Sequence, residues 1–216
     1  QIFINYKMNI SEYYKWLKRD WGKVGFILSF FLFTFLFIFV LKVDIILFVI
    51  LLQIPLYMLH QTEEYVFPGN FGKFFNTKIF KLKTEDEPLN QNFIFFLNVL
   101  LIWIILPVFA LLSIKNYQYG LWIPYFVFFG GVNHILLAIK AKKLYNPGLI
   151  VSLFVNIPIG LWSILFLIDQ GVINDFFLNP YLVIGLGINA LLPILGIIIL
   201  KNYKRKISEI KKRKPI

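Results

Sequence analysis

Six long apolar runs constrain the fold of this chain more than any other feature. Each has close to the roughly 20 residues that an α-helix needs to cross the hydrocarbon core of a bilayer. One soluble core could not bury so many such runs, and the 59% hydrophobic content exceeds the roughly 45–50% that is typical of soluble domains. The sequence therefore predicts an all-α, polytopic membrane bundle of about six transmembrane helices, at about residues 24–41, 44–60, 93–114, 119–139, 148–168 and 179–200.

Two polar segments flank these runs. In residues 1–23, apolar side chains recur at helical spacing between basic ones, which predicts an amphipathic helix lying in the headgroup layer. The apolar run that follows is longer than that of a signal peptide, so we interpret it as a retained helix. We expect residues 24–200 to form the six-helix transmembrane domain and residues 201–216 to form a basic, solvated and partly disordered cytoplasmic tail.

The basic residues indicate an orientation. If both termini are cytoplasmic, only Lys42 and Lys115 fall in the outer loops, which is the asymmetry that the positive-inside rule predicts for six spans. The net charge of +11 lies mostly between and outside the apolar runs, so it favours membrane topology over nucleic-acid binding. The predicted cytoplasmic segments hold Lys7, Lys15, Lys18, Arg19, Lys23, Lys73, Lys78, Lys81, Lys83, Lys140, Lys142, Lys143 and the basic residues from Lys201 to Lys214.

A few polar residues fall at membrane depth, where each is costly and is a candidate functional group. The second run ends in "HQTEEY", and on a helix His60, Glu63 and Glu64 share a face that continues to Tyr57 and Gln53. The only other histidine, His134, follows Asn133 in the fourth run, and Asn98 lies in the third run at a comparable depth. These groups converge on the cytoplasmic half of the predicted membrane domain.

Three interpretations of this cluster remain open. Two imidazoles and a carboxylate commonly bind catalytic zinc or non-haem iron, so His60, His134 and Glu64 are candidate ligands for a divalent metal, with zinc favoured over iron. The chain has no cysteine, which excludes thiolate ligands, and it lacks the second histidine of the HExxH motif. Alternatively, a histidine and a carboxylate act as acid and base without a metal, or the polar groups only connect helices.

The residues also resemble a family of bacterial and archaeal membrane proteins named for an HxxEE motif. The motif matches "HQTEEYVFPGNF", and a second match is Asn133–His134 followed by Tyr145, Pro147 and Gly148 in "LYNPGL". The resemblance covers roughly residues 40–200 and implies a prokaryotic plasma-membrane protein. It also implies that both motifs contribute to one site, but it does not identify a substrate.

The function that we expect is a metal-dependent membrane enzyme that hydrolyses or transfers part of a lipid or other amphipathic substrate. Glu63 and Glu64 are the candidate catalytic residues, one as ligand and the other as general base, while Gln53, Tyr57, Asn98, Asn133 and Tyr145 are candidates for substrate binding. The alternative is a lipid or small-molecule binding protein or carrier that uses the same cluster. Expected partners are membrane lipids, an amphipathic ligand and further copies of the chain in a homo-oligomer, but not nucleic acid.

The long connection over residues 65–92 has two possible roles. Its phenylalanines and lysines could form a second interfacial helix or a lid over a pocket at the cytoplasmic side. An ordinary amphipathic connector explains the same composition.

Overall fold

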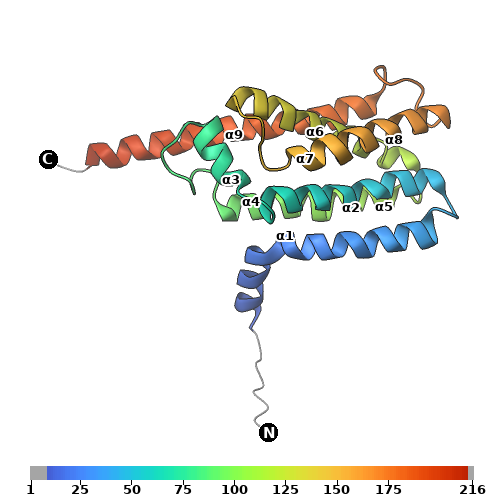
Figure 1. The fold of residues 1–216 in the computed structure, drawn as a ribbon, viewed down its shortest axis with the longest axis horizontal. Coiled ribbons are helices and arrows are strands. Elements are labelled where there is room, and N and C mark those ends of the chain that lie inside the picture. The colour runs from blue at the N-terminus through green and yellow to red at the C-terminus, as the bar shows by residue number, and fades with distance from the viewer. Residues whose placement is uncertain (1–8, 214–216) are drawn as a thin grey trace, which may run out of the picture.

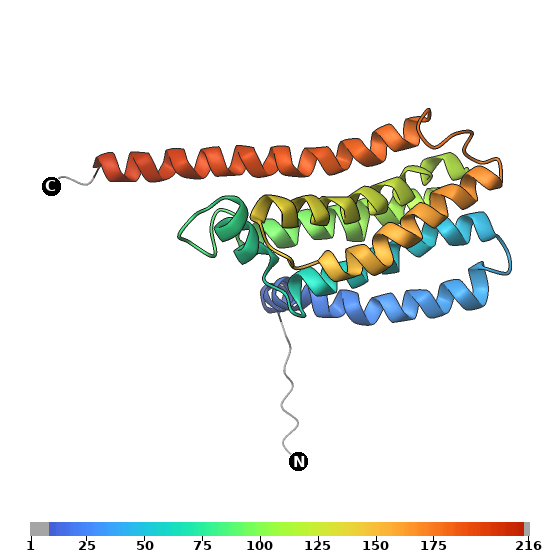
Figure 2. The same cartoon turned by 45° about the horizontal axis from the view of Figure 1, so that its top comes forward.

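The computed structural model describes residues 9–213, and all regular structure among them is helical (Figures 1 and 2). Lys7 and Lys214, which the orientation argument includes, lie outside the described residues. The elements are α1 (Ile10–Phe35), η1 (Leu36–Val40), α2 (Ile45–Tyr65), α3 (Phe71–Phe74), η2 (Phe75–Ile79), α4 (Gln91–Asn98), η3 (Val99–Ile105), α5 (Leu106–Leu112), η4 (Tyr117–Tyr119), α6 (Trp122–Ala141), α7 (Leu149–Val151), η5 (Ser152–Asn156), α8 (Ile157–Asp169) and α9 (Pro180–Arg213).

Consecutive elements join into six helices that are long and apolar enough to cross a membrane, which confirms the predicted fold class. Local signals set several helix starts: an Asn9–Glu12 capping box begins α1, and the side chains of Asp44 and Asn90 cap α2 and α4. The six helices are Ile10–Val40, Ile45–Tyr65, Gln91–Leu112, Tyr117–Ala141, Leu149–Asp169 and Pro180–Ile210.

Three helix boundaries differ from the prediction. The described part of the interfacial segment, from Ile10, and the first apolar run form one helix, and Figure 1 shows that its first turns run across the direction of the rest. Helix α2 continues to Tyr65, so the HxxEE residues form the last turn and a half of the helix and do not lie beyond it. Helix α9 continues through the basic segment to Arg213, because no glycine or proline interrupts residues 201–213.

Helix α2 is the central element of the bundle. In the most apolar 18-residue stretch of α2, 72% of the residues are buried inside the protein, whereas only 17% are buried in the corresponding stretches of the first and last long helices. It packs against α1 on one side and against α6 and α8 on the other, while α9 packs along α6 (Figure 1). A polar side chain on α2 is therefore shielded from lipid by neighbouring helices.

The two ends of the bundle differ in what they carry. One end of the bundle, which we call the terminal end, holds the start of α1, the segments 66–90 and 142–148, and the C-terminal half of α9 (Figures 1 and 2). At this end the short helix α3–η2 lies close to α9, where Phe75 and Phe80 are near Gly196. Both HxxEE and "NH" occur toward this same end.

Candidate metal centre

His60, Glu64 and His134 meet in the interior of the bundle, although α2 and α6 are far apart in sequence. Glu64 Oε1 lies 3.3 Å from His134 Nε2 and 3.6 Å from His60 Nε2. All three residues are buried, and the two imidazole rings are 4.6 Å apart between centroids. The structure thus brings the three predicted metal ligands into one cluster.

Asn146 determines how the ring of His134 is oriented. Its side-chain amide donates to the backbone oxygen of His134 at 2.9 Å, so its own oxygen must be the atom that faces the ring. That oxygen lies 2.7 Å from Nδ1, which therefore carries the ring hydrogen and donates it. The lone pair of Nε2 is left pointing toward Glu64.

Ser152 acts in a similar way on His60. The hydroxyl of Ser152 donates to the backbone oxygen of Gly148 at 2.6 Å, which leaves the hydroxyl oxygen free to accept. His60 Nδ1 lies 3.5 Å from that oxygen, a long contact in which the ring is the donor. His60 Nε2 then also presents a lone pair to Glu64.

Gly148 lets the chain pass directly behind both rings. Its φ of +98° favours glycine, and a Cβ at this position would lie 2.9 Å from His60 Cε1 and 2.9 Å from His134 Nδ1. Any larger residue would push the imidazoles away. The "NPG" sequence is therefore the back wall of the cluster as well as a turn.

Glu63 and Glu64 have different surroundings, although they are adjacent in sequence. The carboxylate of Glu63 accepts from the backbone N–H groups of Ile150 and Val151 at 3.1 and 2.6 Å and from the hydroxyl of Tyr145 at 3.1 Å. It therefore caps the first turn of the helix that begins at α7. These contacts favour a structural role for Glu63 over the expected role of general base.

The cluster fits a divalent cation well. Two neutral imidazole nitrogens and one carboxylate oxygen form a typical ligand set for zinc, and ligands bound at 2.0–2.1 Å in a tetrahedron lie about 3.3–3.4 Å apart. Both separations from Glu64 Oε1 are close to that value. The far ring nitrogens donate to the side-chain oxygens of Asn146 and Ser152, and metal-binding histidines are commonly held by outer partners in this way.

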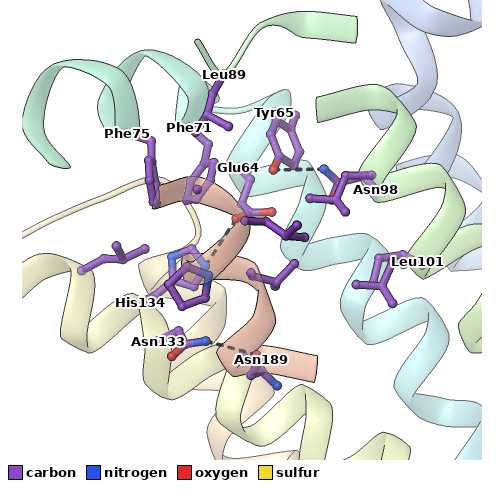
Figure 3. Close-up of a pocket in the computed structure, with 18 of the residues that line it drawn as sticks. Glu64, Tyr65, Phe71, Phe75, Leu89, Asn98, Leu101, Asn133, His134 and Asn189 are labelled. Atoms are coloured by element: carbon purple, nitrogen blue, oxygen red, sulfur yellow. Dashed lines mark hydrogen bonds and ion pairs between the residues drawn. The ribbon is translucent and has the colours of Figure 1, made fainter. Parts of the chain in front are cut away.

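An elongated cavity of about 300 Å³ reaches the cluster, and Figure 3 shows Glu64 and His134 in its wall. Apolar side chains form most of the wall. They come from α2, from the α3–η2 segment, from α4–η3, from α6 and from α9, and include Phe71, Phe75, Phe93, Leu97, Leu101, Ile102, Leu136, Leu137, Leu192 and Leu195. The cavity therefore combines an apolar lining with a buried polar centre.

A directed series of hydrogen bonds ends at the cavity. Trp103 donates to Gln61 at 3.2 Å, Gln61 donates to Asn98 at 2.9 Å, and Asn98 donates to the hydroxyl oxygen of Tyr65 at 3.2 Å. Because that oxygen already accepts a hydrogen bond, the phenolic hydrogen remains available as a donor. Tyr65 lines the cavity beside Glu64 (Figure 3), so its hydroxyl can donate to the Glu64 carboxylate or to a ligand in the cavity.

The predicted substrate-binding residues divide into two groups. Tyr57, Asn98 and Asn133 line the cavity, with Asn133 donating to Asn189 at 3.1 Å. Gln53 lies outside its lining and donates to Ser163 at 3.0 Å, which links α2 to α8. Tyr145 also lies outside the lining, where it donates to Glu63. The structure does not bring these last two into the cavity.

Sequence reasoning missed the residues that support the ligands. Asn146 and Ser152 are fully buried against the histidines, and Tyr65 lines the cavity, yet the sequence pattern singles out none of the three. For Asn146 a signal existed, because "YNPG" joins two helices that both approach the cluster and a turn asparagine often bonds locally. Ser152 and Tyr65 carry no such signal, since their partners come from other segments.

The comparison with protein families identifies the chain. The model of the family described as "Protein of unknown function with HXXEE motif" matches residues 51–163, slightly more than half of the sequence. The chain therefore belongs to this family, and the matched range includes His60, Glu64, His134 and Asn146. Comparisons with curated proteins and with solved structures gave no match.

Proposed function

We propose that this protein is a membrane enzyme that uses a divalent metal ion to hydrolyse or transfer part of an amphipathic substrate. One observation carries the proposal: three buried acceptor atoms, on His60, Glu64 and His134, converge on one point at the wall of an apolar cavity. Buried acceptors without a donor between them are costly, and one cation satisfies all three. The same ligand set also binds non-haem iron, and zinc is favoured because the separations of 3.3 and 3.6 Å from Glu64 Oε1 are close to the edge of a zinc tetrahedron.

The residues around the centre divide the remaining tasks. His60, Glu64 and His134 would hold the zinc ion, which would supply Lewis-acid polarisation of a carbonyl or phosphoryl oxygen and lower the pKa of a bound water. Tyr65 donates a hydrogen bond to a substrate oxygen, while the apolar wall holds the substrate chain and excludes water. Glu63 holds the α7 helix in place, so that Asn146 and Ser152 keep both histidines oriented.

The orientation that we propose places the terminal end of the bundle in the cytoplasm. The described lysines and arginines at that end support it, since the opposite end carries only Lys42 and Lys115. The metal centre then lies in the cytoplasmic half of the membrane. A cysteine introduced at Glu85 should be protected from an impermeant thiol reagent added outside intact cells, whereas one at Asp169 should react.

Metal analysis of the purified protein tests the proposal directly. Protein extracted in mild detergent without chelators should contain about one equivalent of zinc, and His60→Ala, Glu64→Ala and His134→Ala should each lose it while keeping the helical circular-dichroism spectrum. Asn133→Leu is the control, because Asn133 is adjacent to His134 but bonds to Asn189 outside the cluster, and this variant should retain the metal. Wild-type protein without any bound zinc or iron would refute the metal centre.

The cavity also supports a second function, namely a lipid or small-molecule binding protein without catalysis. Its wall is largely apolar and it is large enough for part of an amphiphile. Ligand binding that persists at full strength after the metal has been removed and after His134→Ala would favour this function. Turnover of a substrate that stops on chelation and returns with zinc would favour the enzyme.

A further inference from the structure

We propose that the cavity ligand is a single-chain amphiphile with an anionic head group, which enters from the bilayer beside α9. This inference rests on the proposed function and specifies its substrate class. It is carried by the shape of the cavity, by where the cavity reaches the surface, and by the charges along it.

The dimensions of the cavity match one apolar chain. On α6 its lining extends from Gly130 to Lys140, ten residues that correspond to about 15 Å along a helix. Its volume of about 300 Å³ is at the lower end of the range for small-molecule sites. A long and narrow space of this size accommodates one chain and excludes the two chains of a phospholipid.

The cavity reaches the surface at apolar side chains. Leu136 on α6 and Leu195 on α9 both line it, yet they are 56% and 38% exposed. Since these helices are apolar enough to cross a membrane, exposed leucines at this position face lipid. A ligand can therefore move between bilayer and cavity without passing through water.

Charge distinguishes the two ends of the cavity. Lys140 is exposed at the end nearest the loop 142–148, and among the described residues no carboxylate lies within ion-pair distance of it. By contrast, Lys73 is paired with Glu85 at 2.8 Å. Glu64 is the one carboxylate among the lining residues, and a bound divalent cation more than neutralises it. The end of the cavity near Lys140, where the head group would lie, is therefore positively charged.

Two glycines of α9 provide a matched pair of variants. A Cβ at Gly196 would project into the cavity with only ordinary contacts, the nearest at 3.5 Å to Phe80 Cζ, so Gly196→Leu fills the cavity without a backbone clash. A Cβ at Gly187 meets nothing within 4 Å, so Gly187→Leu adds the same side chain to the same helix outside the cavity. Leu101→Trp fills the cavity from the opposite wall and serves as a second blocking variant.

The experiment measures binding of dodecyl phosphate and of dodecyltrimethylammonium to the protein in phosphatidylcholine nanodiscs by native mass spectrometry. Wild type and Gly187→Leu should bind one dodecyl phosphate per chain, with at least tenfold preference over the cationic probe. Gly196→Leu and Leu101→Trp should weaken binding of the phosphate at least tenfold. Lys140→Met should reduce the preference for the anion about tenfold, because one charge-assisted contact is lost.

Equal binding of the two probes by wild type, or equal binding by the Gly196→Leu and Gly187→Leu variants, would overturn the inference. Zinc content measured on the same samples separates it from the proposed function. Metal present with no selective binding refutes the ligand class alone. Absence of metal from wild type refutes the metal centre, whatever the probes do.

Discussion

Asn146 provides the sharpest test of the proposed metal centre, because it touches the proposed ligand His134 without being a ligand itself. Its amide makes two hydrogen bonds with His134: the amide oxygen accepts from ring Nδ1–H at 2.7 Å, and the amide nitrogen donates to the backbone oxygen at 2.9 Å. The side chain is fully buried, so water does not replace it after substitution. Asn146→Leu keeps a similar volume and removes both bonds.

The expected loss of zinc affinity is 10- to 100-fold, the usual effect of removing an outer partner of a metal-bound histidine. This corresponds to about 1.4–2.8 kcal/mol of binding free energy. The free energy of unfolding should also fall by about 1–3 kcal/mol, since the backbone oxygen and ring N–H of His134 lose their partners. Asn146→Asp keeps an acceptor for the ring N–H, so its zinc affinity should stay close to that of wild type.

Competition with a chromophoric zinc chelator, in detergent, measures these affinities. Asn133→Leu is the matched control, because Asn133 precedes His134 on α6 but bonds to Asn189. If Asn146→Leu binds zinc as tightly as wild type while His134→Ala does not bind it, the ring is not held by Asn146. If Asn133→Leu weakens binding as much as Asn146→Leu, the effect comes from general damage to α6.

Three further predictions follow from single contacts. Gly148→Ala should lower zinc affinity at least tenfold in the chelator assay, because a Cβ would displace both imidazoles, and unaltered affinity would contradict this. Asn156→Leu should leave the midpoint of thermal unfolding unchanged or raise it, since both amide atoms of Asn156 lack partners among the described residues. Asn189→Leu should lower that midpoint, because it loses several hydrogen bonds of about 1 kcal/mol each. Burial and the nearby charge of Glu63 raise the pKa of Tyr145 in the folded protein. Its contribution to the free energy of unfolding is therefore complete below the unfolded pKa of about 10 and declines as the pH rises above that value. The free energy of unfolding of Tyr145→Phe should decline less at alkaline pH than that of wild type, and an equal decline would refute the assignment.

Sequence patterns predicted the helices well because hydrophobic length is a local property. The six apolar runs gave the number and order of the long helices, and helical spacing placed His60 and Glu64 on one face. The ends of α1 and α9 were predicted less well. Apolar length marks where lipid begins and ends, but a helix continues through polar residues until a breaker stops it.

The site was predicted only in part, since contacts between distant segments are not local. Polarity at membrane depth identified His60, Glu64 and His134 before their proximity was known. It could not reveal that Gln53 bonds to Ser163 across a helix interface and not to a ligand. Polar residues that join helices and polar residues that bind ligands look alike in sequence, because both avoid lipid for the same reason.

The geometry of an α-helix explains why the HxxEE motif contains two adjacent glutamates. Successive residues are about 100° apart around the axis, so Glu64 lies about 40° from His60 on one side while Glu63 lies about 60° from it on the other. Glu64 therefore shares the buried cluster with His60, whereas Glu63 faces the first turn of α7 and accepts hydrogen bonds from its N–H groups. That helix begins beside Asn146, which orients His134. In the proposed metal centre the motif would thus supply two ligands and fasten the segment that orients the third, so we expect Glu63→Ala to weaken zinc binding indirectly and Glu64→Ala to abolish it.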